Sequence, residues 1–177
     1  MGVWSGPFLI AAVLLAVAGI AKAIDPTMTV GALRRFGVPV PSGAVRGLGV
    51  LEALLAVAAA ITGSPTLAVG VTVSYLLFSA FVVIARARRL PIGSCGCFGR
   101  IDTPPSWLHV AVDLTAAASA LGVATRDGGG LGATLSHQPL AGLPFLALIG
   151  VGAYAAFTAL TVVPQLVALS AETRRTR

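Results

Sequence analysis

Long runs of apolar residues, separated by short polar segments, make up most of this chain. Five runs have the length of a membrane-spanning helix, which needs about 17–25 mostly apolar residues. The five runs extend over about residues 3–24, 43–62, 66–85, 107–124 and 140–169. In lipid, backbone polar groups must be satisfied within the protein, so runs of this length are expected to be helices. The pattern predicts an all-α membrane protein: a single domain, 1–177, containing a bundle of about five transmembrane helices.

The first and last runs raise separate questions. The sequence Ala21-Lys22-Ala23 at the end of the first run is similar to a signal-peptide cleavage site. However, no positive charge precedes the run, and the run is longer than a signal-peptide core, so we expect a retained helix. The last run is long enough to tilt, or to bend near Pro164.

The composition agrees with lipid as the main solvent. Hydrophobic residues make up 56% of the chain and charged residues 10%, whereas a soluble domain has about 25% charged residues. The net charge of +6 does not indicate nucleic-acid binding, because the arginines cluster at the ends of apolar runs without stacking aromatics. This distribution is typical of residues that anchor helices at lipid headgroups. We therefore expect a lipid bilayer as partner and no nucleic acid.

The positive charges also predict an orientation. If all five runs span, the loops and the tail on one side carry almost all the arginines, and the other side has only Arg126, in a glycine-rich connector. We expect the protein in a cell membrane, either plasma or inner. The positive-inside rule then places the N-terminus outside and the C-terminus in the cytoplasm. The arginines on the cytoplasmic side are Arg34, Arg35, Arg46, Arg86, Arg88, Arg89, Arg100, Arg174, Arg175 and Arg177.

Several ionisable residues lie inside the predicted helices: Lys22, Glu52, His109 and Asp113. A charge at the centre of a spanning helix is unfavourable by about 2.5–3.5 kcal/mol, so it normally faces the bundle and has a partner. From the cytoplasmic face, Glu52 should lie roughly 13 Å deep and Asp113 roughly 9 Å deep. We expect Lys22 to pair with Glu52, and Asp113 with His109. Alternatively, Lys22 reaches the headgroups beside Asp25, and Asp113 pairs with a loop arginine.

Small residues recur four positions apart in the runs, as in Gly49/Ala53, Ala56/Ala60 and Gly152/Ala156. This spacing lets helices approach closely in lipid. It predicts a compact bundle.

The two cysteines of the chain, Cys95 and Cys97, lie in the loop segment SCGCFG. Gly96 between them allows backbone angles that bring the sulfurs together. A disulfide across one intervening residue departs from relaxed geometry and is easily reduced, which suits an exchange centre better than a structural staple. Neighbouring arginines favour the thiolate form. The segment therefore predicts a redox pair.

Two other readings of the cysteines stay open. Two thiolates suit a soft ion such as Cu(I), Zn or Hg, so Cys95 and Cys97 are an alternative metal-binding or metal-transport site. A structural zinc site needs four ligands and this loop offers two, so no resident metal is assigned. In the second alternative the protein is a non-catalytic scaffold of a membrane complex, and the cysteines are dispensable.

Three segments together resemble the methylamine utilisation protein MauE family, which is grouped with DoxX-like membrane proteins. They are KAIDP at 22–26, GVLEALLAV at 49–57 and CGCFG at 95–99. The resemblance covers most of the first four helices. It implies a factor for thiol-redox processing or maturation of an exported, disulfide-rich protein, the small subunit of methylamine dehydrogenase, beside a thioredoxin-like partner. It also implies that Cys95 and Cys97 are the redox pair and that Lys22 and Glu52 are a buried polar pair.

The predicted orientation affects the mechanism, because disulfides are made outside the cytoplasm whereas the arginines place the cysteine loop inside. Either the orientation is the reverse of the predicted one, or the pair carries reducing equivalents across the bilayer. One dithiol must meet a second protein, a quinone, or both faces in turn, so a quinone is a candidate cofactor. Lys22, Glu52 and Asp113 would supply or take up the protons. The chain would act as an accessory protein of thiol–disulfide exchange.

Overall fold

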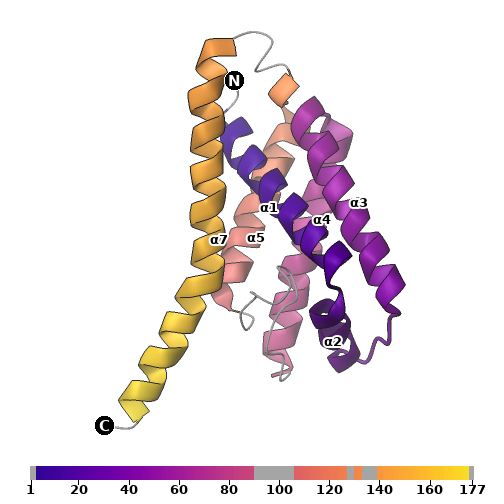
Figure 1. Ribbon diagram of the computed structural model, residues 1–177, viewed down its shortest axis with the longest axis vertical. Coiled ribbons are helices and arrows are strands. Elements are labelled where there is room, and N and C mark those ends of the chain that lie inside the picture. The colour runs from indigo at the N-terminus through magenta and orange to yellow at the C-terminus, as the bar shows by residue number, and fades with distance from the viewer. Residues whose placement is uncertain (1–2, 90–105, 127–129, 133–138, 176–177) are drawn as a thin grey trace.

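The computed structural model describes residues 3–89, 106–126, 130–132 and 139–175. For the last range, the side chains are described for residues 142–163. The described residues contain no strand, and their helices are arranged as a bundle (Figure 1). The helices are α1 (Ser5–Ile24), α2 (Thr27–Arg35), α3 (Ser42–Thr62), α4 (Pro65–Ala87), α5 (Trp107–Thr125) and α7 (Pro139–Arg175).

The predicted all-α membrane architecture is confirmed. Among the described residues, five helices are long and apolar enough to cross a membrane: α1, α3, α4, α5 and the part of α7 from Gly142 to Val163. Many large apolar side chains on these helices face outward, including Leu51, Leu77 and Val151, each about two-thirds exposed. An outward apolar surface of this extent is stable in lipid and unstable in water. The protein is therefore a multi-pass membrane protein.

The last helix is longer than predicted. It continues through Pro164 as one element and ends at Arg175, where the apolar run predicted an end near residue 169. The helix therefore includes two of the basic residues assigned to the tail, Arg174 and Arg175.

The short helix α2 was not predicted, since its residues were expected to form a loop. The Asp25 carboxylate accepts hydrogen bonds from the backbone N–H of Thr27, at 3.1 Å, and from the Thr27 hydroxyl. An Asp–Pro pair just before a helix is a start signal, because the carboxylate satisfies a free N–H and proline fits the first turn. Phe36 stacks on Phe81, with ring centroids 4.5 Å apart, and holds this end of α2 against α4.

A tight turn joins α3 to α4. Gly63 ends α3 with a φ of +63°, a left-handed conformation that glycine adopts without a steric penalty. Pro65 is the first residue of α4. Proline fits there because an N–H at this position would have no acceptor within the helix. The two helices are therefore antiparallel neighbours.

The interior of the bundle is built around α1. This helix packs against α3, α5 and α7, and α4 packs along α5. The main core cluster combines side chains of α1 with residues of α3, α4, α5 and α7. Its buried members are Phe8, Leu9, Ala11, Leu15, Ala56, Ala59, Ala68, Val71, Tyr75, Ala116, Ala117, Ala120, Val123 and Ile149.

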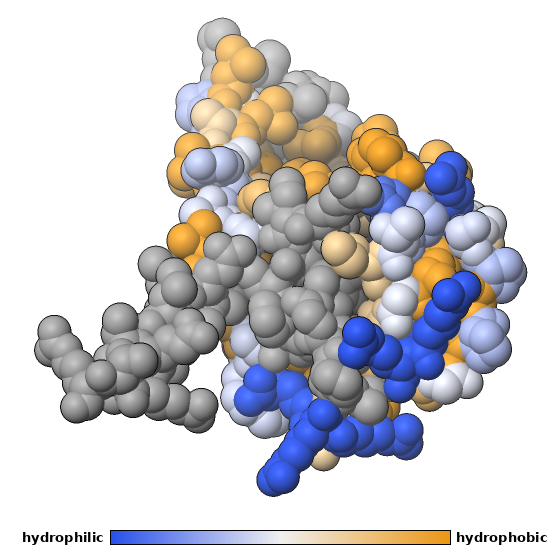
Figure 2. Space-filling model, turned by 60° about the horizontal axis from the view of Figure 1, so that its bottom comes forward, coloured by the Kyte–Doolittle hydropathy of each residue, from blue (hydrophilic) through white to orange (hydrophobic). Residues whose placement is uncertain are grey.

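Exposed arginines gather at one end of the bundle, here called the basic end. This end contains α2, the end of α4 and the beginnings of α3 and α5 (Figure 1). Figure 2 shows the hydrophilic side chains collected on this end, with apolar surface beside them. The described arginines of the basic end are Arg34, Arg35, Arg46, Arg86, Arg88 and Arg89. Their position agrees with the distribution along the sequence.

Candidate functional site

A buried ion pair joins α1 to α3. The Lys22 ammonium lies 2.7 Å from a carboxylate oxygen of Glu52, and donates a hydrogen bond to it. The two residues are only 3% and 5% exposed. The structure thus contains the pairing of Lys22 with Glu52 that the sequence predicts. An ion pair kept out of water and lipid needs close geometry, because the loss of hydration offsets much of the attraction between the charges.

The close geometry comes from two glycines. A Cβ atom added to Gly19 would lie 2.5 Å from the carbonyl oxygen of Gly49, and one added to Gly49 would lie 2.5 Å from that of Gly19. The backbones therefore touch where α1 crosses α3. Lys22 and Glu52 each follow one of these glycines by three positions, which places each on the crossing face of its helix.

Helix α4 adds two aromatic residues to this region. The Lys22 ammonium lies 4.4 Å from the ring centroid of Phe78, which makes a cation–π contact. Tyr75, one turn earlier, donates a hydrogen bond of 2.6 Å to the carbonyl oxygen of Ala11 on α1. The two rings meet edge to face, with centroids 6.0 Å apart. The Lys22 ammonium thus contacts both a carboxylate and the face of an aromatic ring.

Neither Tyr75 nor Phe78 was predicted as a site residue from the sequence. They lie in the predicted helix without charged residues, where an aromatic residue is normally read as core or lipid-facing. Nothing in their spacing distinguishes them from the other apolar residues of α4. Their importance follows from the position of α4 beside Lys22.

His109 and Asp113 line a small cavity that also borders this aromatic pair. Its walls also include Tyr75 and Phe78, and its volume is about 20 Å³, enough for roughly one water molecule. His109 is 3% exposed, and its Nδ1 lies 2.8 Å from the hydroxyl of Ser106. Asp113 is half-buried. The structure brings both residues to one cavity, and their pairing with each other stays a prediction.

Cys95 and Cys97 lie outside the described residues. The chain leaves the described region after Arg89 and re-enters it at Ser106. Close to these two points, the Arg86 guanidinium lies 5.2 Å from the ring centroid of Trp107. This contact joins the end of α4 to the beginning of α5. The segment that carries the cysteines therefore starts and ends at the basic end.

The described residues contain no group of three or more His, Cys, Asp and Glu residues able to hold a metal ion. The alternative of a soft-metal site rests on Cys95 and Cys97, outside those residues.

Comparison with known proteins gives a family for most of the chain. Residues 2–126 match the family model described as "Methylamine utilisation protein MauE". The match includes α1 to α5 and leaves out α7. Neither a curated protein nor a solved structure matches the chain. The predicted family is confirmed: this membrane protein belongs to the MauE family, which is linked to methylamine utilisation.

Proposed function

We propose that this protein is an integral membrane factor for thiol-redox maturation of an exported protein, with Cys95 and Cys97 as the exchanging pair. The family's link to methylamine utilisation supports a client in methylamine metabolism, and we propose the disulfide-rich small subunit of methylamine dehydrogenase as the client and a thioredoxin-like protein as the partner. One observation carries the proposal: a buried Lys22–Glu52 pair lies inside the bundle, in the half nearer the end where the cysteine segment begins and ends.

A buried ion pair supports a functional role because it is a poor way to stabilise a helix bundle. Well-packed apolar residues of similar volume often give equal or greater stability, and ionisable groups within a membrane commonly mark proton or substrate pathways. Thiol exchange needs such groups, because the attacking cysteine must lose its proton to become a thiolate.

The length of the chain limits how far the cysteines can lie from this end. Cys95 follows Arg89 by six residues, and Cys97 precedes Ser106 by nine. A fully extended chain spans at most about 3.6 Å per residue, which gives limits of about 22 Å and 32 Å. In the proposed function the pair acts beside the arginines of the basic end, which would favour thiolates.

The proposed exchange balances as follows. A thiolate of the Cys95–Cys97 pair attacks one sulfur of a protein disulfide, forming a mixed disulfide and releasing the other sulfur as a thiolate, which takes up a proton. The second cysteine then attacks the mixed disulfide. The partner gains two electrons and two protons, and the Cys95–Cys97 pair becomes a disulfide. In the reverse direction the pair oxidises its partner.

In this scheme the ion pair and Asp113 handle protons near the thiols. Glu52 and Asp113 are the carboxylates that can accept a proton, and Lys22 holds Glu52 in place at 2.7 Å. In the proposed orientation the basic end lies on the cytoplasmic side of the cell membrane, and the N-terminus lies outside. Electrons then pass between the cytoplasmic side and the exported client through a membrane-soluble carrier or a second protein.

The direct test is to trap the mixed disulfide. In Cys95→Ser or Cys97→Ser variants the resolving step is lost, so at least one should accumulate a covalent complex with its partner. Non-reducing gels and mass spectrometry would identify that complex. Ser94→Ala is the matched control, which keeps both cysteines. The double Cys→Ser variant is the negative control, because it cannot form a mixed disulfide.

The outcomes separate the three functions. The proposal is wrong if neither single variant traps a partner and the oxidation state of the client in cells is unchanged. Copurification of a soft metal in reducing buffer, lost on thiol alkylation, would instead indicate metal binding. Full function of the double Cys→Ser variant would indicate a scaffold.

A further inference from the structure

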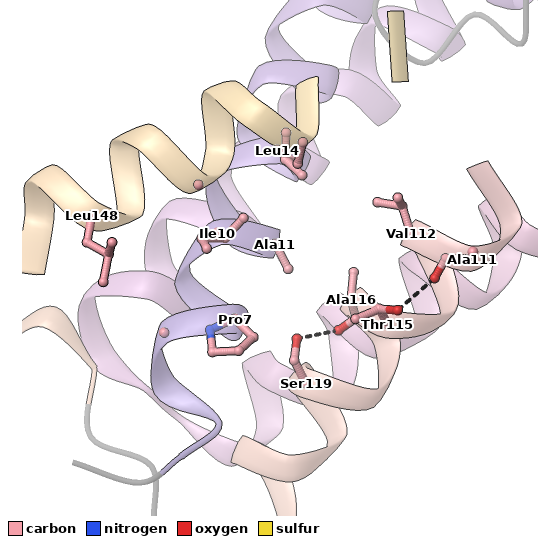
Figure 3. A pocket seen from close by; sticks show the side chains of 13 residues that line it. Pro7, Ile10, Ala11, Leu14, Ala111, Val112, Thr115, Ala116, Ser119 and Leu148 are labelled. Carbon is pink, nitrogen blue, oxygen red and sulfur yellow. Dashed lines mark hydrogen bonds between the residues drawn. The ribbon is translucent and has the colours of Figure 1, made fainter. Parts of the chain in front are cut away.

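An open apolar cleft lies between α1, α5 and α7 (Figure 3). Its volume is about 510 Å³, within the range of about 300–1,000 Å³ typical of small-molecule sites. Each helix contributes part of the wall. The residues that line the cleft include Pro7, Ile10 and Leu14 of α1, Val112, Thr115 and Ser119 of α5, and Leu148, Gly152 and Ala156 of α7.

The cleft exists because α7 leans on α1 and makes few contacts with α5. At Gly152 the two helices are closely packed, since a Cβ atom added there would lie 2.6 Å from Cδ1 of Ile10. Beyond this contact the cleft between α5 and α7 is open. Because α7 lies outside the residues that match the family, the family-matched part of this chain alone does not form the cleft.

The lining is suited to an uncharged, mainly hydrocarbon ligand. The two hydroxyl groups in the cleft donate hydrogen bonds within α5: Thr115 to the carbonyl of Ala111 and Ser119 to that of Ala116, each at 2.8 Å (Figure 3). None of the described residues that line the cleft is charged. A chain of methyl and methylene groups would therefore fit against its walls.

One end of the cleft has a different chemistry. Leu14 and Val112 wall both the cleft and the small cavity lined by His109 and Asp113. Asp113 follows Ser106, at the beginning of α5, by seven residues, so it lies about 10 Å along the helix from the basic end. An apolar cleft thus ends beside an imidazole and a carboxylate at hydrocarbon depth. A phospholipid headgroup does not fit beside these two groups, because it would have to leave water.

We propose that the cleft binds an isoprenoid quinone. The tail lies between α5 and α7, the ring lies at the end formed by Leu14 and Val112, and one ring oxygen points toward His109 and Asp113. The neighbouring cavity of about 20 Å³ has room for one oxygen atom or one water molecule, but not for the ring. The ring therefore occupies the cleft itself.

This assignment rests on the proposed function for the role of the ligand. Oxidation of two thiols to one disulfide releases two electrons and two protons, and these convert one quinone to its quinol. The carboxylate of Asp113 and the imidazole of His109 are placed to pass protons to the ring oxygen. The quinone would therefore be the electron acceptor of the Cys95–Cys97 pair.

The test is photolabelling of the full chain in nanodiscs of phosphatidylcholine, with a ubiquinone analogue that carries an azide. Saturable labelling is expected at peptides of α5 and α7. Ala111→Phe fills the cleft and should weaken labelling at least tenfold. Ala118→Phe is the matched control, since Ala118 is exposed on the same helix and does not line the cleft. It should label like the wild-type chain.

Leu148→Trp is a second cleft-filling variant, at a side chain that is 68% exposed and so tolerant of change. It too should weaken labelling, and it replaces Ala111→Phe if that variant does not fold. Equal labelling of the cleft-filling variants and the control would overturn the proposal. Non-saturable labelling would do the same, because it would indicate a general groove for the acyl chains of the nanodisc.

Labelling of the double Cys→Ser variant distinguishes a failure of the quinone site from a failure of the proposed thiol-redox function. This variant should bind the quinone analogue like the wild-type chain, because it changes none of the described residues that line the cleft. If the quinone binds and no mixed disulfide can be trapped, the proposed function fails and the site stands. If a mixed disulfide forms and the cleft does not label, the quinone site fails alone.

Discussion

Lys22 and Glu52 meet at 2.7 Å inside the bundle, each three positions after a glycine that brings the backbones of α1 and α3 into contact. The crossing and the ion pair depend on each other. The glycines allow the close approach, and the approach shields both charges. This arrangement leads to predictions that separate stability from function.

Removal of one partner of the ion pair should strongly destabilise the protein. Lys22→Met or Glu52→Leu leaves a single buried charge, and the free energy of unfolding should fall by about 3–5 kcal/mol. The double variant Lys22→Met/Glu52→Leu removes both charges and should recover most of that loss. Unfolding in mixed detergent micelles would measure both effects. Because the double variant folds without the proton-handling carboxylate, it should not support maturation of the client. Full activity in the double variant would show that the pair is structural.

The glycine contact gives a prediction with a control on the same helix. Gly49→Ala places a methyl group 2.5 Å from the Gly19 carbonyl oxygen, so α1 and α3 must move apart. Gly47→Ala meets nothing within 4 Å and should be neutral or stabilising by up to about 1 kcal/mol, since alanine favours the helix. Thermal unfolding should show a lower Tm for Gly49→Ala than for Gly47→Ala. Equal Tm values would mean that the backbones are not in contact.

The contact between Lys22 and Phe78 should appear as an energetic coupling. In a double-mutant cycle with Lys22→Met and Phe78→Leu, the interaction energy should be about 0.5–2 kcal/mol, as for a desolvated cation over an aromatic ring. The readout is the free energy of unfolding of the four proteins. Strict additivity would show that the ammonium does not interact with the ring.

The proposed orientation predicts which face carries the thiols. A membrane-impermeant maleimide should label Cys95 and Cys97 in inside-out vesicles and not in right-side-out vesicles. Thr125→Cys in the double Cys→Ser background is the control, because Thr125 is exposed at the opposite end of α5 and should show the reverse pattern. Labelling of the native cysteines from the outside would reverse the orientation and place the exchange on the exported side.

The sequence was sufficient for features that depend on local composition. Apolar run lengths predicted the spanning helices, with ends near Ile24, Thr62 and Thr125. The high energy of a lone charge in lipid predicted that Lys22 would find a partner in Glu52. One cation can offset one buried carboxylate, and Glu52 at mid-depth cannot reach water alone, so pairing was the simplest solution.

Other features depend on packing across the bundle, and the sequence does not encode them locally. Tyr75 and Phe78 look like ordinary apolar residues of α4 until α4 is placed beside Lys22. The cleft depends on how α7 leans on α1 at Gly152, which no run length or spacing indicates. The α2 helix was missed for a different reason: its start at Asp25 is a short capping signal next to a longer, dominant apolar pattern.

The most direct test of the account is a redox titration of Cys95 and Cys97 in the purified protein. The protein in nanodiscs would be equilibrated in buffers of defined thiol–disulfide potential, then alkylated, and its free thiols counted by mass spectrometry. The account predicts a reversible change from two free thiols to none, as one two-electron step, at a potential of about −270 to −180 mV, where thiol-exchange proteins operate. Two free thiols at every potential would contradict it.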